Sequence, residues 1–325
     1  MANSMHSSLS TVSLDELGVL RARGAGVVAF LQGQLSNDLT RLSPERSLLA
    51  GYHNPQGRVI ALLRLLQFAP DDLLAVLPRE LVAPVAARLS RFILRAKVQL
   101  ADESQQWRIS GLLRVGANSV RAGATLETDN DAALPTTENE AARTATRSIV
   151  RLAGEPARWL LVSPMSGAES PDAAPAADPL IWRRLGVAAG EPQVYAATSE
   201  EFIAQMLNLD CLGAIAFEKG CYTGQEVIAR AHYRGRVKRR MQRFVTRSLL
   251  QLRPADAGTL SDGRTFKVVD AAQLADGRCE FLAVTQLTVE PASAAEAAAG
   301  AGRDAKAGTA ALAAEQLELP YPLPE

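Results

Sequence analysis

The residues with the clearest chemical potential lie together in residues 217–231, which read FEKGCYTGQEVIARA. Thr223 and Glu226 have the spacing of a capping box, so we expect Thr223 to cap a helix. Cys221 lies two residues before this cap, and Lys219 is close to it in sequence. The N-terminus of a helix and an adjacent ammonium group both favour a thiolate. The stretch therefore predicts a reactive thiol at Cys221, with Lys219 assisting it.

A structural role for Cys221 is the alternative. A free cysteine before a helix is often a small, buried, unreactive side chain. No histidine or second cysteine stands near Cys221 in the sequence. Spacing alone therefore leaves both interpretations open.

A basic stretch follows the cysteine, because residues 227–255 contain no Asp or Glu. Such a stretch can hold the phosphates of RNA or the polyglutamate tail of a folate. The alternative is a solvated linker whose cations pair with acids elsewhere. His232 and Tyr233 lie within it. Its nine cationic residues are Arg230, Arg234, Arg236, Lys238, Arg239, Arg240, Arg243, Arg247 and Arg253.

Two apolar features could form the wall of a binding site. Trp182 precedes Arg183 and Arg184, and an aromatic ring beside cations can stack on a planar heterocycle, although a core position is the alternative. Thr198 and Glu201 form a second capping box, which predicts a helix. Its apolar residues, expected to pack in the core or to form a flat wall for a ligand, are Phe202, Ile203, Met206 and Leu207.

Composition excludes several classes of protein. The chain has 325 residues, 47% of them hydrophobic, and Lys+Arg and Asp+Glu both total 35, so its formal net charge is zero. A globally basic nucleic-acid binder and an acidic disordered chain are both disfavoured. The three cysteines, Cys211, Cys221 and Cys279, form no C-x-x-C pair, so we expect neither a disulfide framework nor a stably bound metal.

Targeting signals are the next question. The first residues, MANSMHSSLST, lack a basic region followed by an apolar core. The longest apolar run, residues 59–66, is far shorter than the roughly 20 residues that span a bilayer. We therefore expect a cytoplasmic protein without membrane contact.

The order of apolar patterns predicts an α+β fold. Helical spacing at residues 26–35 and 79–96 alternates with short strand-like runs. We expect those strands at residues 14–23, 48–52, 59–68 and 73–77. A stretch rich in Pro, Ala and Ser, residues 163–179, predicts a long loop insertion.

The sequence changes in character after residue 240. Short apolar pieces are separated by the turn dipeptides Asp262-Gly263 and Asp276-Gly277, which favour antiparallel hairpins. We therefore expect a small antiparallel barrel or sandwich as a second unit. Residues 292–314 are nearly all Ala, Gly and small polar residues, which predicts a disordered insertion.

The motif KGCYTGQE, residues 219–226, resembles in full the signature of the YgfZ family of folate-binding proteins. Its flanks, residues 190–210 and 229–240, are also similar to that family. FLQGQLSND at residues 30–38 and NPQGR at residues 54–58 resemble the family's N-terminal motifs. The similarity thus extends from about Leu14 to Arg243.

The resemblance implies a fold like that of the glycine-cleavage T-protein. Residues 1–240 would form a folate-binding body of two intertwined α+β subdomains around a central channel, and residues 241–325 a C-terminal antiparallel β-barrel. It implies tetrahydrofolate as cofactor and a role as an accessory factor for assembly or repair of iron–sulfur clusters in client enzymes, including tRNA-thiolating ones. The implied partners are iron–sulfur client or carrier proteins, with a weak tRNA contact through the basic residues from Arg230 to Arg243.

The resemblance also assigns roles to individual residues. Cys221 takes the place of the signature cysteine, with Lys219 beside it. Trp182 falls where some members have a tryptophan that contacts folate, and Leu17 falls where those members have a second one. The expected cofactor contacts are Leu17, Trp182, Gln225, Glu226, Arg230 and Tyr233.

One departure from the T-protein affects the predicted activity. In the T-protein, the turn that matches Asn54–Gly57 leads to a pair of aspartates that serve aminomethyl transfer. Here Ala61 and Leu62 stand in that strand, and neither can act as a base or stabilise a developing cation. We therefore expect folate binding without transferase chemistry. The alternatives are a folate-dependent aminomethyl or one-carbon transferase and a tRNA-binding module.

Overall fold

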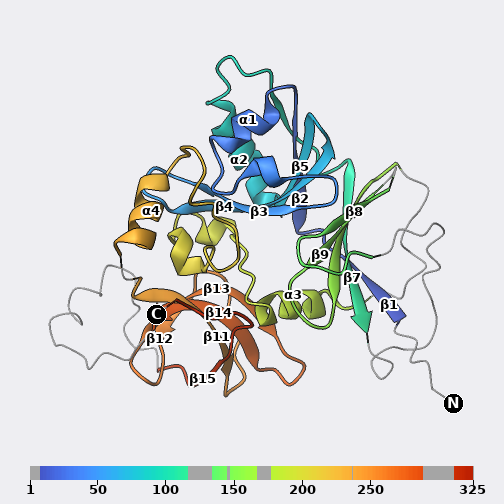
Figure 1. Ribbon diagram of the computed structural model, residues 1–325. Helices are drawn as coiled ribbons and strands as arrows, with labels where there is room; N and C mark the ends of the chain where they lie inside the picture. Colours follow the sequence, from blue (N-terminus) through green and yellow to red (C-terminus); the bar gives the residue numbers. More distant parts are fainter. Residues whose placement is uncertain are drawn as a thin grey trace.

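The described part of the protein contains three five-stranded sheets, and every strand pair in them is antiparallel (Figure 1). The computed structural model describes residues 8–115, 134–144, 147–166, 177–235, 237–287 and 311–324. The fold is thus of mixed α and β type, as the pattern of the sequence predicts. Most of the predicted insertions at residues 163–179 and 292–314 lie outside the described residues.

The first sheet carries the apolar runs of the N-terminal third of the chain. Its order is β3 (Leu48–His53), β4 (Val59–Ala69), β5 (Asp72–Pro78), β2 (Leu17–Arg23) and β6 (Gln99–Asp102). Strand β4 is buried along its first eight residues because both faces of the sheet are covered. The four predicted strands are therefore present, each within a few residues of its expected ends.

Helices α1 (Val27–Gln32) and α2 (Arg79–Ser90) pack their buried residues into the same core as this sheet. Both are shorter than the sequence predicts. In α2 the buried positions end at Leu89, whereas Phe92 is 50% and Leu94 is 87% exposed. Since most helix stability in proteins comes from a buried face, nothing supports a further turn.

The second sheet has two buried faces. Its order is β1 (Ser8–Ser13), β7 (Trp107–Val115), β10 (Arg158–Pro164), β9 (Ser148–Leu152) and β8 (Ala141–Arg143). One face packs toward the first sheet through residues such as Val150 and Leu160, and the other carries Ile149 and Trp159. Strand β10 extends to Pro164 and helix α3 (Pro179–Ala188) begins at Pro179, so both ends of the predicted 163–179 loop are regular structure.

The C-terminal sheet has the order β12 (Ala257–Thr259), β13 (Thr265–Gln273), β14 (Cys279–Gln286), β11 (Arg239–Thr246) and β15 (Ala314–Leu317). The predicted barrel is not confirmed, because β12 and β15 remain the edges of an open sheet. An isolated bridge pairs Leu260, directly after β12, with Leu312, shortly before β15. The predicted disordered insertion overlaps the start of β15 at Ala314. A domain division at residue 240 stays a prediction.

Backbone pairing explains why the predicted helix after Thr198 does not form. Two short 3₁₀ turns take its place, η3 (Ala196–Thr198) and η4 (Ala204–Leu207), and Thr198 closes the first of them. Between these turns the chain pairs with β4, since Val59 N–H donates to Phe202 O and Glu200 N–H donates to Val59 O, both at 2.8 Å. Of the predicted apolar positions, Phe202 and Leu207 are buried in the core.

Helix α4 (Gln225–Tyr233) starts later than predicted and has a different cap. Its N-cap is Gly224, at φ 83°, and no side chain caps it, so the predicted capping by Thr223 is wrong. Ile228 is buried as expected, but Val227 is 37% exposed. A third short 3₁₀ turn, η1, spans Leu39–Arg41. In the part of the chain that is described, no helix has the length and apolar character needed to span a membrane.

Candidate functional site

A cavity of about 360 Å³ lies where the first sheet, the second sheet and helix α3 meet. This volume is in the range of sites that hold small organic molecules. Its apolar walls include Leu17 from β2, Leu62 from β4 and Trp182 from α3. Its charged lining residues are Glu16, Arg64, Arg158, Arg183, Glu191 and Asp270.

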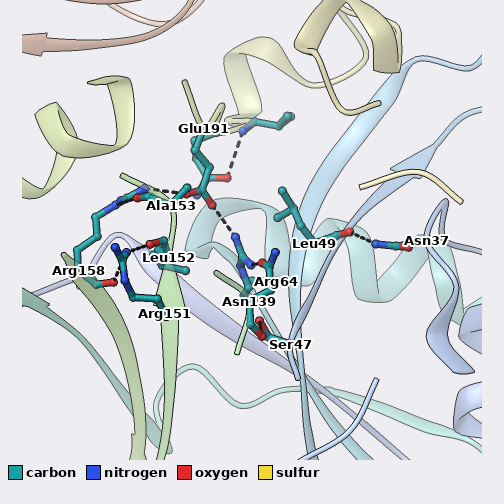
Figure 2. Close-up of polar contacts among 12 residues, drawn as sticks. Asn37, Ser47, Leu49, Arg64, Asn139, Arg151, Leu152, Ala153, Arg158 and Glu191 are labelled. Atoms are coloured by element: carbon teal, nitrogen blue, oxygen red, sulfur yellow. Dashed lines mark hydrogen bonds and ion pairs between the residues drawn. The ribbon is translucent and has the colours of Figure 1, made fainter. Parts of the chain in front are cut away.

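One end of the cavity is a buried charge cluster (Figure 2). Glu191 receives a guanidinium N–H on each carboxylate oxygen, from Arg64 Nη2 to Oε1 at 2.7 Å and from Arg158 Nη2 to Oε2 at 2.7 Å. Burial alone would raise the pKa of Glu191, but the two guanidinium groups outweigh it and lower the pKa. The side chains of Arg158 and Arg64 are only 3% and 9% exposed, so the cluster is an internal ion triad with one excess positive charge.

Neighbouring loops fix the two arginines. Arg158 Nε donates to Ala153 O at 2.9 Å, and Arg64 donates to the side chain of Asn139. Figure 2 shows both contacts, with Arg151 donating to the carbonyl group of Leu152 beneath them. Each of the two guanidinium groups thus donates to one neighbouring loop as well as to Glu191, as buried charges require partners.

Trp182 forms one wall and lies over Gly111 of β7. A Cβ atom at Gly111 would come within 2.4 Å of the indole Cε3, so the glycine makes room for the ring. The guanidinium carbon of Arg158 lies 5.2 Å from the Trp182 ring centroid, a cation–π distance. Trp182 is 8% exposed, so it is a core residue that also lines the cavity.

A second group of charged lining residues surrounds Asp270. Arg183 Nε donates to Asp270 Oδ1 at 2.8 Å, and the hydroxyl of Tyr195 lies 3.2 Å from Asp270 Oδ2. Burial raises the pKa of Asp270 despite Arg183, and burial also raises the pKa of Glu16. The cavity therefore offers both guanidinium donors and carboxylate acceptors, at the Glu191 cluster and again around Asp270.

The predicted reactive cysteine belongs to another region, the Cys221 loop, which we define as residues 217–224. Cys221 itself is exposed and free. The next residue, Tyr222, is buried, and its ring centroid lies 6.3 Å from that of His53 on β3. The loop thus presents its thiol to solvent and anchors itself through the neighbouring tyrosine.

Lys219 anchors the same loop. Its ammonium group donates to the carbonyl oxygens of Gln32, Leu35 and Asn37 at 2.6, 2.7 and 2.8 Å. These contacts use all three of its donors on the last residue of α1 and the chain that follows it. Burial lowers the pKa of Lys219 to about 8. The structure places Lys219 as a positioning residue, and assistance to Cys221 stays a prediction.

Two sequence motifs meet at this loop. A Cβ atom at Gly224 would lie 2.6 Å from Asn54 O and 3.1 Å from Gly57 Cα. One at Gly57 would lie 3.0 Å from Val227 Cβ. Both glycines have positive φ, at 83° and 71°. The turn of the NPQGR motif and the KGCYTGQE motif therefore interlock through two glycines, which explains why both need them.

His53 lies under this junction. It is fully buried, and neither ring nitrogen has a hydrogen-bond partner in the described part of the chain. Burial lowers its pKa to about 3. A neutral imidazole at this position makes the junction sensitive to acid.

The structure separates the predicted site residues into two groups. Leu17 and Trp182, far apart in sequence, line the same cavity. The other predicted contacts belong to the Cys221 loop and α4, and they are absent from the described lining of the cavity. That second group comprises Cys221, Lys219, Gln225, Glu226, Arg230 and Tyr233.

The basic stretch is divided as well. Arg240 pairs with Asp210 at 2.8 Å, and Arg243 pairs with Glu280. Arg230 and Arg234 are exposed, and no described carboxylate lies within ion-pair distance of either one. Tyr233 beside them is 66% exposed. Part of the stretch is thus structural, whereas the end of α4 remains available.

Sequence reasoning missed the polar cavity residues. Arg64 interrupts a buried apolar run, and an arginine at such a position is a signal that sequence reasoning could have used. Glu191 follows a glycine that ends a helix, which gives no comparable signal. Arg158 and Asp270 carry no comparable signal. In the described ranges, no group of three or more His, Cys, Asp or Glu side chains could hold a metal ion.

Two curated relatives match most of the chain. The chain is 30% identical to the tRNA-modifying protein YgfZ of Serratia proteamaculans over 84% of this chain and 83% of the relative. It is also 30% identical to the tRNA-modifying protein YgfZ of Escherichia coli O157:H7 over 88% of both chains. No protein-family model matches the chain.

A solved structure shows the same fold. The glycine cleavage system aminomethyltransferase T of Bartonella henselae superposes with a TM-score of 0.64 over 87% of this chain and 80% of that protein. Its sequence identity is only 12%, so the likeness concerns the fold. It confirms the predicted T-protein-like architecture.

Proposed function

This chain belongs to the YgfZ family, and from that premise we propose that it is a tetrahydrofolate-binding accessory factor for assembly or repair of iron–sulfur clusters. Its clients would include enzymes that thiolate tRNA, in keeping with the name of its relatives. The observation that carries the proposal is the cavity whose lining brings Leu17 and Trp182 together with two groups of charged residues. Its location would be cytoplasmic.

The residues of the cavity fit a reduced folate. The pyrimidine ring of a reduced pterin is planar and carries N–H donors, and the glutamate tail carries carboxylates. Trp182 and Leu17 offer flat apolar contact, while Glu191 and Asp270 offer acceptors. The guanidinium groups at the Glu191 end and that of Arg183 offer donors for carbonyl or carboxylate oxygens.

Tetrahydrofolate supplies one-carbon chemistry when it is bound. The residues of this chain support binding more than transfer, because Leu62 lines the cavity and Ala61 lies in the core, where the T-protein resemblance implies aspartates. An apolar wall orients a ring and excludes water, but it moves no proton. A one-carbon transferase is therefore the less favoured alternative.

Cys221 is the residue proposed to handle iron–sulfur cargo. It is exposed on a loop that Lys219 and Tyr222 hold in place. An exposed thiol on an anchored loop is suited to transient ligation of iron. Cluster binding normally takes four ligands, so the remaining ligands would come from a client or carrier protein.

Calorimetric titration under anaerobic conditions tests the cofactor. We expect micromolar binding of tetrahydrofolate that weakens about three- to tenfold in Trp182→Leu, which removes the aromatic ring, since aromatic contacts contribute about 0.5–1.5 kcal/mol. The matched control is Trp159→Leu, because Trp159 of β10 lies on the face of the second sheet opposite the face on which Trp182 packs. No binding by the unaltered protein, or equal weakening in both variants, would refute the proposed site.

A weak tRNA contact is a second proposal, carried by the exposed end of α4. Tyr233 stands there beside Arg230 and Arg234. Aromatic stacking and cations together suit an unpaired nucleotide. We expect tRNA affinity that falls steeply with salt and weakens in Arg230→Ala/Arg234→Ala. Salt-independent binding, or none, would leave the folate proposal standing without an RNA partner.

A further inference from the structure

The C-terminal segment after β15, residues 318–324, crosses from the C-terminal sheet to the folate-binding body, and we name it the C-terminal strap. Arg243 Nη1 donates to Glu318 O at 3.3 Å where the strap begins. Leu319 packs against the main hydrophobic core. The hydroxyl of Tyr321 donates to Gly190 O at 2.7 Å. The strap is thus attached at a point 131 residues away in sequence.

Gly190 is shaped to receive the strap. It has φ 63°, and a Cβ atom there would lie 2.8 Å from Leu319 Cδ2 and 2.9 Å from the Tyr321 hydroxyl. The positive φ favours a glycine, and any larger residue would also push the Leu319 and Tyr321 side chains away from this turn.

Gly190 directly precedes Glu191, the carboxylate of the buried charge cluster. The turn that carries both residues closes helix α3, with Gly190 N–H donating to Val187 O at 3.0 Å and Glu191 N–H donating to Gly186 O at 3.1 Å. The Tyr321 hydroxyl holds the carbonyl group between these two residues. A shift of the strap would therefore move the backbone of Glu191.

A second cavity, of about 170 Å³, lies on the strap side of Glu191. Pro320 and Tyr321 line it, and it shares Leu49, Arg64 and Glu191 with the first cavity. Glu191 and its ion-pair partner Arg64 therefore line both cavities. The strap lines the second cavity only.

We propose that Tyr321 is a positioning residue for the cavity, holding the Gly190–Glu191 turn so that the Glu191 carboxylate faces the bound ligand. The proposal rests on the proposed function where that ligand is a reduced folate. Burial raises the pKa of Tyr321, so its hydroxyl remains a protonated donor at neutral pH. Asn208 supports the same hydroxyl, with Nδ2 at 3.4 Å.

The first test compares binding of 5-formyltetrahydrofolate, an air-stable reduced folate, by Tyr321→Phe and by Tyr52→Phe. The hydroxyl of Tyr52 makes no hydrogen bond within the described residues, which makes it a matched control. We expect the Kd to rise about three- to tenfold in Tyr321→Phe and to stay unchanged in Tyr52→Phe, as loss of one buried hydrogen bond predicts. A merely structural hydroxyl would lower the Tm without changing the Kd at 25 °C.

A double-mutant cycle tests whether Tyr321 acts through Glu191. In a Glu191→Gln background, which keeps the shape of the side chain, Tyr321→Phe should change the Kd less than twofold. Coupled residues are non-additive in this way. Full additivity of the two changes would overturn the proposed route.

Hydrogen–deuterium exchange provides a readout that needs no ligand. In Tyr321→Phe the amides of Gly190 and Glu191 should exchange several-fold faster, while those of α4 should not change. Faster exchange with no folate binding by the unaltered protein would refute the proposed function and keep the positioning role. Unchanged exchange, or an unchanged Kd in a protein that binds folate, would overturn the inference.

Discussion

The Cys221 loop and the first cavity are built from the chain in opposite ways. The loop is contiguous in sequence, and it presents an exposed thiol on a short anchored turn. The cavity draws on β2, β4, β10, α3 and β13, and its charged residues Arg64, Arg158 and Asp270 are buried. One region can therefore be recognised as a motif, whereas the other exists only after the chain has folded.

The two regions also differ in what holds their charges. Lys219 donates to three backbone carbonyl groups, so its ammonium serves the shape of the loop. Arg64 and Arg158 donate to one carboxylate, so their charges shape the cavity itself. The comparison teaches that a cation beside a candidate nucleophile can be structural, while unremarked cations in the core can line a binding site.

The largest expected effect lies in the cavity. Glu191→Ala should lower the free energy of unfolding by about 3–5 kcal/mol, because it leaves two buried guanidinium groups without a counter-charge. Urea unfolding measures the loss, with Glu155→Ala as control, since the Glu155 side chain is 85% exposed. A loss below about 1 kcal/mol would mean that the cluster is hydrated and that the two regions are less different than described.

Acid should weaken the protein through His53, at the base of the Cys221 loop. Its pKa is about 3 in the folded protein, against 6.5 for the free side chain. The neutral imidazole's contribution to the free energy of unfolding is complete above pH 6.5 and is lost as the pH falls toward 3. The loss is about 1.4 kcal/mol per pH unit, and so about 2 kcal/mol at pH 5. We expect the free energy of unfolding, measured with denaturant from pH 7 to 5, to fall less steeply with pH in His53→Gln than in the unaltered protein. Identical slopes would contradict a buried neutral imidazole.

The interlock of the two glycine motifs predicts a smaller loss. Gly224→Ala should lower the free energy of unfolding by about 1–2 kcal/mol, because φ 83° disfavours a side chain and the added methyl would meet Asn54 O. The control is Gly213→Ala, where φ is also positive but the Cβ position is open. Equal losses in both variants would show that only backbone strain matters and that the motifs do not interlock.

The smallest effect on stability is expected at Cys221. Cys221→Ser should change the free energy of unfolding by less than about 0.5 kcal/mol, because the side chain is exposed. It should nevertheless abolish support of iron–sulfur client enzymes, measured as client activity in cells that carry only the variant. A collapsed Tm with proportional loss of activity would instead make Cys221 a packing residue.

Much of the fold could be predicted from local patterns. The strands of the first sheet follow their apolar runs, and the turn dipeptides after residue 240 mark the C-terminal hairpins. Helix ends were predicted less well. Gly224 replaces Thr223 as the cap, because the chain must turn tightly against the Asn54–Gly57 turn, a contact between segments distant in sequence.

The sequence by itself determined the α+β class, the resemblance to the YgfZ family and the motif that carries Cys221, since each is written in contiguous residues. Only the tertiary structure decided that Leu17 and Trp182 line the same cavity. It also decided that Arg64 and Arg158 both pair with Glu191, and that Tyr321 of the C-terminal strap donates to the carbonyl group of Gly190. The physical reason is that burial and ion pairing join side chains from distant segments, and no local spacing encodes which segments meet.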